Sequence, residues 1–384
     1  MQPSKRFQYL SVVVFLSLVS LLVWFFNSQE RFVYNRQSGP SSVTFERALI
    51  RGVVDETLKP DEKVKGLIKG TQDLNIEILT GAHKGEQHIV KNYLSSRFNV
   101  YGIEGREIIV CVDTAAPGKY RVTVNSYRRS PVLYAAVVLF AIVLAAIGGR
   151  KGVQSIIGLV FTFVCILFLF IPMLFQGYSP VFASVFIVVL TTVATVFCLN
   201  GWTVKSLSAV LGTTLGVVIA GGVSSLFGHL AHINGFHTEE AETLILISAS
   251  TGMNVGQLLF AGILIASLGA VMDVAISISA SIYEVLMTDR TLPRRRLFLS
   301  GMNIGRDVMG SMANTLILAF AGTSINSLIL IYGYNVDYRQ LINLDSIGID
   351  IMHGMCGSIA IVLTVPIVSL LSSWLFPLFL QKSS

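Results

Sequence analysis

Long apolar runs separated by short polar loops make up most of the chain. Runs of membrane-spanning length lie at about 9–26, 131–147, 154–175, 181–199, 206–228, 257–287, 308–332 and 351–380. A helix needs roughly 17–25 predominantly apolar residues to cross the hydrocarbon core of a bilayer, so the longer runs must tilt, kink or protrude. The pattern predicts a mainly α-helical polytopic membrane protein with about eight transmembrane helices.

Residues 43–127 follow a different pattern, in which short apolar–polar alternations are separated by turn residues. Gly81 and Gly85 enclose a hairpin loop between two of these alternations. About five or six short strands over this length predict a small all-β, barrel-like domain of OB or SH3 type, because closure of the sheet removes exposed edges.

The predicted domain order combines these two patterns. Residues 1–26 form a cytoplasmic tail and an uncleaved signal-anchor helix, since the apolar run is longer than a signal-peptide core and no A-x-A-like cleavage site follows it. Residues 27–130 form an extracytoplasmic β domain, with the barrel at about 43–127. Residues 131–384 form a seven-helix membrane domain.

Charge patterning agrees with this topology. Hydrophobic residues make up 53% of the sequence and charged residues 13%, whereas a soluble domain has ~25% charged residues. Basic residues follow alternate apolar runs, but the loops at 176–180, 229–242 and 333–350 contain only one, Arg339. The positive-inside rule then places both termini in the cytoplasm and residues 27–130 outside. The net charge of +6 therefore does not call for a nucleic-acid partner, and the expected partner is the lipid bilayer.

An acidic residue, Asp273, interrupts the sixth apolar run. Gly262, Ala266, Gly269 and Asp273 are spaced 4, 3 and 4 residues apart, and Ser277 continues the same helical face. A carboxylate near mid-bilayer costs at least ~2.5 kcal/mol, so it normally faces protein or water. Asp273 either couples the movement of an ion or solute, or fixes helix packing through a hydrogen bond. Gly262 and Gly269 predict close helix packing under both interpretations.

Two nearly identical runs, GMNVG at 252–256 and GMNIG at 301–305, interrupt the apolar pattern. On the predicted topology they lie toward opposite leaflets, as the broken or half-helices of an inverted repeat would. The alternative is a good helix breaker that the chain uses twice. Their polar side chains and the polar residues that follow are candidate binding groups: Asn254, Gln257, Asn303 and Arg306.

The seventh apolar run begins with a polar face of its own. Asp307, Gly310, Ser311 and Asn314 share one side of a helix, with Asp307 expected near the cytoplasmic interface and Asn314 deeper. Together with Asp273, this face could line one cavity. Alternatively, it forms interhelical hydrogen bonds worth about 0.6–2 kcal/mol each.

Small residues also form a stripe in the fifth apolar run. Gly212 and Gly216 lie one helical turn apart within this stripe. Because small residues at this spacing let a neighbouring backbone approach closely, we expect them to serve helix packing.

The loop after the fifth run contains His229, His232 and His237, followed by Glu239. Imidazoles three residues apart can share a divalent metal ion, and a nearby carboxylate could complete the site. The alternative is structural, because Thr238 and the acids after it are typical of an N-cap and first turn of the next helix.

No motif in the sequence indicates an enzyme. Walker, H-E-x-x-H and G-x-S-x-G signatures do not occur, and the four cysteines show no disulfide or metal spacing. We therefore expect neither catalytic residues nor a cofactor, and ATP-driven activity would need another subunit.

Residues 252–284 and 301–320 resemble the signature of the YibE/F-like family of membrane proteins, and GAHKGE at 81–86 resembles the outer domain of that family. The signal-anchor and outer domain resemble its YibE half, because the shorter half lacks that domain. The resemblance implies a multi-pass protein of the bacterial cytoplasmic membrane, with a shorter paralogue or a second copy as partner. It implies neither a substrate nor catalytic residues.

Two functions of different class fit these features. A secondary transporter or permease subunit for a small solute or ion would use alternating access around Asp273 and Asp307, with broken helices at the two GMN runs. A non-transporting envelope assembly protein would bind a partner through the outer β domain and use its helices as an anchor. The acids within apolar runs favour the first hypothesis, whereas the size of the outer domain favours the second. An integral-membrane enzyme is a weaker third alternative.

Overall fold

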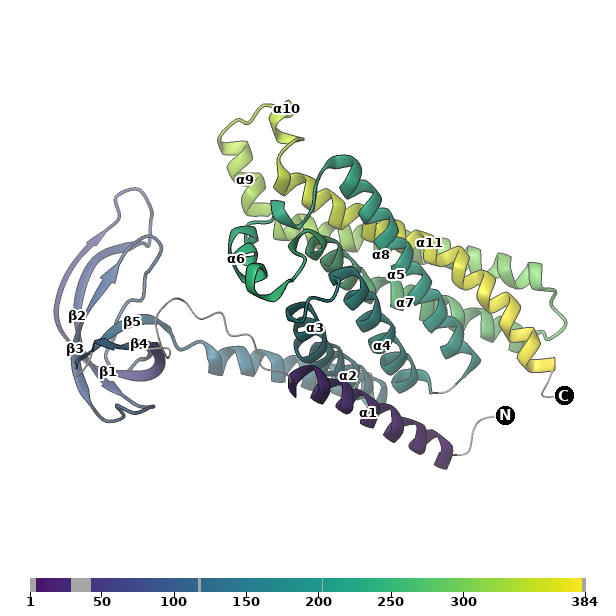
Figure 1. Ribbon diagram of the computed structural model, residues 1–384, viewed down its shortest axis with the longest axis horizontal. Helices are drawn as coiled ribbons and strands as arrows, with labels where there is room; N and C mark the ends of the chain where they lie inside the picture. The colour runs from purple at the N-terminus through teal and green to yellow at the C-terminus, as the bar shows by residue number, and fades with distance from the viewer. Residues whose placement is uncertain (1–4, 29–42, 117–118, 202, 382–384) are drawn as a thin grey trace. The chain divides into compact units, whose positions relative to one another are not determined.

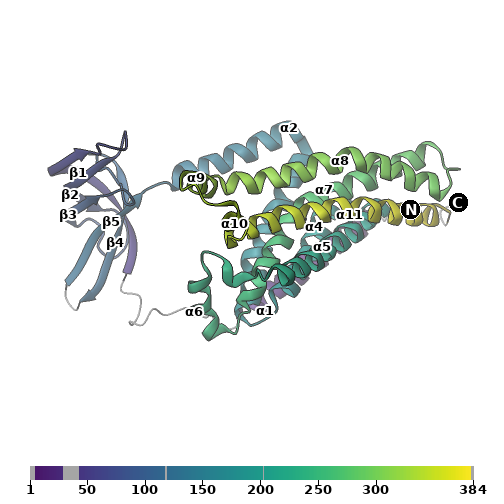
Figure 2. The same cartoon turned by 90° about the horizontal axis from the view of Figure 1, so that it is seen from above.

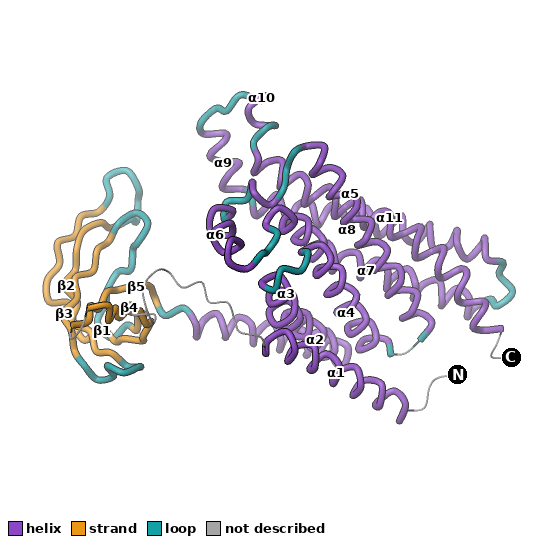
Figure 3. Tube along the Cα trace, viewed as in Figure 1, coloured by secondary structure: helices purple, strands orange, loops and turns teal. Residues whose placement is uncertain are grey.

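The structure is a computed structural model that describes residues 5–28, 43–116, 119–201 and 203–381 (Figure 1). The predictions for the extreme termini, and for the segment 29–42 of the extracytoplasmic domain, lie outside these residues. Contacts divide the chain into two units, residues 33–143 and the combination of 1–32 with 144–384. Among the described residues, the strands lie in the first unit and most helices in the second (Figure 3).

The described strands form one antiparallel sheet in the order β3-β2-β1-β4-β5. Their bounds are β1 (Val43–Pro60), β2 (Ile68–Ile78), β3 (Gln87–Leu94), β4 (Glu107–Ala116) and β5 (Lys119–Tyr127). The predicted glycine loop joins β2 to β3. Alternating apolar side chains, including Ile50, Ile76 and Val110, point into one core. The sheet is curled, which confirms a small barrel-like β domain, although no ladder pairs β3 with β5 among the described residues.

Residues 43–127 are expected to fold as an isolated fragment with a β-type circular dichroism spectrum and a cooperative melt. Ile76→Ala removes a side chain that is 0% exposed and should lower the free energy of unfolding by about 2–5 kcal/mol. Ile89→Ala is the matched control, because Ile89 is 67% exposed, and the change should stay within about 0.5 kcal/mol. A coil spectrum, or equal effects of the two substitutions, would contradict a self-contained core.

Outside the sheet, most of the described residues are helical. The helices are α1 (Lys5–Ser28), α2 (Ser130–Cys165), a π-helical turn (Ile166–Phe170), α3 (Ile171–Phe175), α4 (Pro180–Asn200), α5 (Val204–Ala231), α6 (Ala241–Thr251), α7 (Leu258–Thr288), α8 (Arg294–Thr323), α9 (Ile325–Gly333), α10 (Tyr338–Leu341) and α11 (Asp345–Gln381), with 3₁₀ turns at Gly235–His237 and Val255–Gln257. In the described part of the chain, five helical stretches are long and apolar enough to cross a membrane, or six if α8 and α9, bent by 58°, form one span. The run at 9–26 lies in α1, the run at 308–332 is divided between α8 and α9 at Ser324, and the other predicted runs fall on the remaining helices and turns.

The second and third predicted runs are joined by a tight turn inside α2. Gly149, with φ of 53° and ψ of −133°, leaves the helical conformation. A β carbon built on Gly152 would lie 2.1 Å from the carbonyl oxygen of Leu144, although residues eight apart in a straight helix are about 12 Å apart. The chain therefore folds back on itself at this point, at a positive φ that suits glycine.

The unit that combines residues 1–32 with 144–384 is called the membrane unit below. Helices α7 and α11 occupy its middle and contact α5 and α8 (Figure 2). Their shared core includes Val217 of α5, Val271 of α7 and Val365 of α11. A second core joins α1 to the segment from the π-helical turn to α3, where Val19 and Phe26 pack with Leu169 and Met173. Polar bonds tie the ends of these helices together: the Asn27 side chain donates to the carbonyl of Phe168 at 2.8 Å, and that of Gln176 donates to the carbonyl of Phe26 at 3.0 Å.

The two GMN runs adopt different structures. The first separates the short helix α6 from α7, beginning at Gly252 with φ of 71°, as the break prediction requires (Figure 3). The second lies inside the continuous helix α8, so the predicted break at 301–305 is wrong. The break in this part of the chain lies instead at Ser324, between α8 and α9. Gly301 and Gly305 serve packing, since β carbons there would lie 2.5 Å from an Ile282 atom and 2.2 Å from a Val365 atom.

Candidate functional site

Helix α7 turns one continuous stripe of small and polar residues away from the bundle core. The stripe comprises Gly262, Ala266, Gly269, Asp273 and Ser277, all exposed, and we call it the Asp273 stripe. The opposite face carries the apolar side chains that enter the core: Leu264, Leu268, Val271, Val274 and Ile278. The helical period thus predicted the composition of each face correctly. The side that faces the core of this chain is the apolar one.

Asp273 lies at the middle of α7. It follows the first residue of the helix, Leu258, by 15 positions, which corresponds to about 22 Å of helix. Among the described residues, no hydrogen bond or ion pair to its carboxylate is found. The other acid on the same side of α7, Glu284, lies near the helix end, 3.7 Å from the Lys205 ammonium. Asp273 is therefore the acid whose position requires an explanation.

Helix α8 presents the second polar face. Asp307, Gly310, Ser311 and Asn314 are exposed on it, as the spacing predicted. Asp307 lies near the middle of α8, because the helix begins as early as Arg294. The helix therefore begins well before the apolar run at 308–332 that was used to predict it, and the position of Asp307 near the cytoplasmic interface stays a prediction. The apolar run alone could not show the extra turns, which contain four arginines and the hydroxyl group of Ser300.

The cationic neighbour of Asp307 does not pair with it. The Arg306 guanidinium donates to the Asn303 side-chain oxygen at 3.5 Å, within one turn of α8. In the described structure, neither Asp273 nor Asp307 has a cationic partner. Helices α7 and α8 contact each other where Gly301 and Gly305 of α8 meet Ile282 and Ile278 of α7. Two adjacent helices thus each carry an uncompensated acid near their midpoints.

Residues of the first GMN run contribute to a separate polar junction. The Ser179 hydroxyl at the start of α4 donates to the Gln257 side-chain oxygen at 2.7 Å. Asn254 is exposed and makes no side-chain capping bond to the helix that follows. The structure therefore places both residues at the break before α7, apart from the mid-helix acids.

A polar pocket of about 300 Å³ lies where the turn before α6, the α8–α9 bend and the start of α11 meet. We call it the outer pocket, because the positive-inside rule predicts that these loops face away from the cytoplasm. Its walls carry three carboxylates, one imidazole and several hydroxyl groups, from His237, Thr238, Glu239, Glu240, Thr323, Ser324, Ser327, Ser346, Ile349 and Asp350. Sequence reasoning missed this pocket, because its walls combine residues 237–240 with residues 323–350, which begin more than 80 positions later in the chain.

His353 connects the outer pocket to the Asp273 stripe. It lies one turn after Ile349 on α11, and its Nδ1 is 3.1 Å from the Ile349 carbonyl oxygen. Its ring lies against Phe320 of α8, with 5.1 Å between ring centroids. Its Nε2 is 3.8 Å from the position that a β carbon on Gly262 would occupy. The end of the stripe at Gly262 therefore adjoins His353, which lies one turn after Ile349 of the pocket.

The four glycines predicted to serve helix packing fall into two pairs. Those of α5 face α11, where β carbons on Gly212 and Gly216 would lie 2.2 Å and 2.1 Å from side-chain atoms of Val368 and Thr364. Those of the Asp273 stripe are open: nothing lies within 4 Å of a β carbon on Gly269, and Gly262 meets only the His353 ring. Within this chain, the stripe glycines therefore do not receive another helix.

The predicted metal ligands do not assemble into a metal site. In the described ranges, no group of three or more His, Cys, Asp or Glu side chains is arranged to hold a metal ion. His232 instead ends α5 in a left-handed conformation, and His237 forms a capping box with Asn234. The expected capping by Thr238 also differs, because Glu240 is the residue at the N-cap of α6 and its side chain makes no capping bond.

Comparison with known proteins identifies the membrane unit. No curated protein and no solved structure matched the chain. A family model described as YibE/F-like protein matches residues 136–378, which include all of α7 and α8 and most of α11. The match covers more than half of the chain, and together with the apolar helices it identifies a membrane-embedded protein. The chain belongs to the YibE/F-like protein family.

Proposed function

We propose that this chain is a subunit of a secondary transporter or permease for a small solute or ion. The observation that carries the proposal is Asp273, which lies at mid-helix on an uncovered stripe of small residues, without a hydrogen-bond or ionic partner among the described residues. An acid in that position is costly in lipid, and a purely structural acid would be expected to have a partner within the fold.

The second acid supports the same interpretation. Asp307 lies near the midpoint of the neighbouring helix α8 and is also exposed and uncompensated. Two carboxylates on adjacent helices can bind a proton or a cation in one conformation and release it in another, which is the basis of ion coupling. The proposal involves no covalent chemistry and no cofactor.

The proposal includes a second membrane subunit that covers the Asp273 stripe. Small residues at Gly262 and Gly269 leave room for the backbone of another helix. A shorter member of the family, or a second copy of this chain, would supply that helix. The solute path would then run between the two subunits, from the outer pocket past His353 to the acids.

The experiment that tests transport begins with a deletion strain. We expect the intracellular or extracellular level of one solute or ion to change in this strain. Proteoliposomes that contain the purified protein and its membrane partner should then take up that solute or ion. Uptake should be lost when the pH or ion gradient that couples it is collapsed. If no solute level changes and reconstituted vesicles transport none of the candidates, the proposal is wrong.

The proposed orientation can be tested by labelling intact cells with an impermeant thiol reagent. We expect a cysteine at His229 to react and one at Arg295 to react only after the cells are opened, because the basic loops belong in the cytoplasm. Both positions are exposed in the structure, so local burial does not bias the comparison. The reverse pattern would overturn the topology in which both termini are cytoplasmic.

A further inference from the structure

Positive charge is concentrated where α7 ends and α8 begins. Four arginines lie within residues 290–296, and we call them the arginine patch: Arg290, Arg294, Arg295 and Arg296. All four residues are exposed. Between positions 285 and 306 the sequence contains only one acidic residue, Asp289. The patch therefore combines several like charges that repel one another at short range.

The acids nearest in sequence do not neutralise the patch. The Asp289 carboxylate accepts hydrogen bonds from the backbone N–H and the hydroxyl group of Thr291, at 2.9 Å and 2.6 Å. Glu284 lies 3.7 Å from the Lys205 ammonium. In the described part of the chain, no carboxylate forms an ion pair with an arginine of the patch. An anion from outside the chain would relieve the repulsion.

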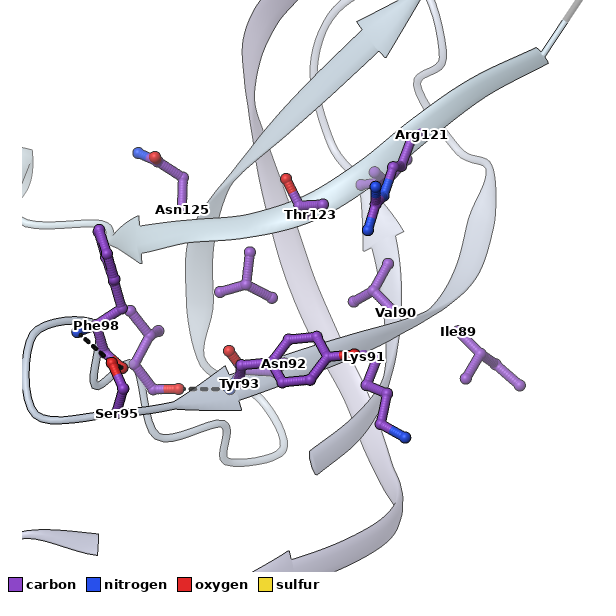
Figure 4. Close-up of a pocket in the computed structure, with 13 residues that line it drawn as sticks. Ile89, Val90, Lys91, Asn92, Tyr93, Ser95, Phe98, Arg121, Thr123 and Asn125 are labelled. Atoms are coloured by element: carbon purple, nitrogen blue, oxygen red, sulfur yellow. Dashed lines mark hydrogen bonds between the residues drawn. The ribbon is translucent and has the colours of Figure 1, made fainter. Parts of the chain in front are cut away.

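The β domain provides a comparison. A groove of about 430 Å³ between β3 and β5 includes two cations, Arg121 and Lys91, among its lining residues (Figure 4). In strand register, Arg121 lies opposite Asp113 and Lys91 lies opposite Asp73. Side chains directly opposite each other in a sheet are neighbours, so each of these cations has an acid of this chain beside it. The arginine patch has no such arrangement among the described residues.

Packing holds the patch in place at the end of the helical bundle. Leu297, one residue after the patch, is fully buried in the same core as Leu286 of α7 and Phe376 of α11. The Arg294 guanidinium lies over the ring of Trp374 on α11, 5.0 Å from the ring centroid. The start of α8 is thus fixed against α7 and α11, and one arginine is fixed against an exposed tryptophan.

Trp374 indicates where the membrane surface lies relative to the patch. It is 56% exposed and lies five positions before the end of the apolar stretch Asp345–Phe379. Tryptophan is enriched where the hydrocarbon core of a bilayer meets the headgroups. Arg294, which lies over this ring, is therefore expected at the depth of the lipid phosphates.

An apolar surface for acyl chains adjoins the same tryptophan. Leu370, Trp374 and Leu378 are spaced four residues apart on α11 and are all exposed. Residues at this spacing share one face of a helix. A molecule that contacts Trp374 can therefore place an anionic group at Arg294 and apolar groups along this face.

The spread of the arginines favours lipid over a single small anion. Consecutive residues of a helix diverge by about 100°, so Arg294, Arg295 and Arg296 begin on different sides of α8. A free phosphate would need these side chains to converge on one point. Neighbouring lipid headgroups instead present several phosphates, and a guanidinium can bind each of them through two parallel N–H···O bonds.

We propose that the arginine patch and Trp374 form a binding site for anionic phospholipids. Headgroup phosphates would bind the guanidinium groups, and acyl chains would lie along the face of α11 that carries Trp374. Basic clusters next to a membrane-spanning helix attract anionic headgroups by the same electrostatics. The site lies at the turn between α7 and α8, apart from the acids at the middle of these helices, and does not depend on transport.

The test measures contact between lipid and Trp374 in the full-length chain. The other two tryptophans are removed by Trp24→Phe and Trp202→Phe, and the protein is placed in phosphatidylcholine nanodiscs that contain a small fraction of brominated lipid. Brominated phosphatidylglycerol should quench Trp374 fluorescence with about tenfold higher apparent affinity than brominated phosphatidylcholine. Equal quenching by the two lipids would overturn the proposal. So would loss of the preference when inorganic phosphate is added at constant ionic strength, because the site would then take a free anion.

Two double variants in this background locate the site. Arg295→Gln with Arg296→Gln should lower the preference for phosphatidylglycerol to less than about twofold, whereas Arg295→Lys with Arg296→Lys should keep most of it, because the positive charge remains. Arg150→Gln with Lys151→Gln is the matched control, since these exposed residues form the basic turn within α2, outside the patch. Circular dichroism checks that each variant is folded. If the control lowers the preference as much as the glutamines at 295 and 296, the attraction is a general effect of surface charge and the assignment is wrong.

Discussion

Replacing Asp273 by asparagine is expected to reduce solute turnover per assembled molecule by about 100-fold, because hydrogen bonds and ion contacts of a charged group are worth about 1.5–3 kcal/mol. Asparagine has nearly the same shape but cannot bind or release a proton or pair with a cation. The exposed position of Asp273, with no partner in the described structure, indicates that the protein will still insert and fold. Uptake by proteoliposomes, normalised to assembled complex, measures the effect.

Glu284→Gln is the control for this substitution. Glu284 lies on the same side of α7 but near its end, beside Lys205, so turnover should change less than about twofold, as expected for an exposed ion pair. Near-normal turnover in Asp273→Asn would exclude a coupling role and leave a packing role for the acid. A fall of equal size in both variants would show that charge on this face, rather than Asp273, is what matters.

Gly216→Leu is expected to destabilise the isolated chain, whereas Gly269→Leu is expected to leave its stability unchanged and to prevent docking of a second subunit. A β carbon at position 216 would lie 2.1 Å from the Thr364 hydroxyl oxygen and 3.0 Å from Val271. Gly216→Leu should therefore force α5 away from α11. Such overpacking lowers the free energy of unfolding by a few kcal/mol, which corresponds to a fall of about 10 °C in the melting temperature of the purified chain. Thermal unfolding in detergent measures this change.

Gly269→Leu should leave the melting temperature of the isolated chain within about 2 °C, because no atom lies within 4 Å of the new β carbon. It should instead prevent the second subunit from docking on the Asp273 stripe, since the groove between small residues would be filled. Cross-linking or co-purification measures the loss of complex. Destabilisation of the isolated chain equal to that of Gly216→Leu would mean that the stripe packs within the fold, contrary to the structure.

Local sequence was sufficient to predict the elements of the β domain. Period-two alternation identified the strands, and the two glycines of the loop at 81–85 identified the β2–β3 hairpin. Local sequence was not sufficient to predict whether the sheet closes into a barrel. A closed barrel was expected from the general cost of exposed edges, but the contact between Tyr120 and His88 joins β5 to β3 by side chains. Such a contact joins residues far apart in sequence, and no periodicity reveals it.

The two GMN runs show why the same local sequence can have two outcomes. At 252–256, Gly252 takes a positive φ and the chain leaves the helix. At 301–305, both glycines remain helical because Ile282 and Val365 occupy the space next to them. Tertiary contacts therefore decide whether glycine breaks a helix or lets two helices approach.

Helical periodicity placed Asp273 on the correct face, but it could not show what lies opposite that face. Composition alone allowed the apolar residues Leu264 and Val271 to contact lipid or a core, and the packing of α5 and α11 against them shows that they form the core. The outer pocket was also beyond prediction, since it requires the turn before α6, the α8–α9 bend and α11 to meet. Asp350 and His353, one turn apart at the start of the last span, were the local signal that could have pointed to it.

Water access to the Asp273 stripe tests the central claim most directly. In a background without the four native cysteines, the variants Gly269→Cys and Ser277→Cys are labelled in membranes with a water-soluble thiosulfonate. The control is Val218→Cys, at the middle of α5 on an exposed apolar face. A solute path predicts that the two stripe cysteines react quickly while the control does not. Reaction of all three cysteines at the same slow rate would mean that the stripe faces lipid or a dry interface, and would contradict the account.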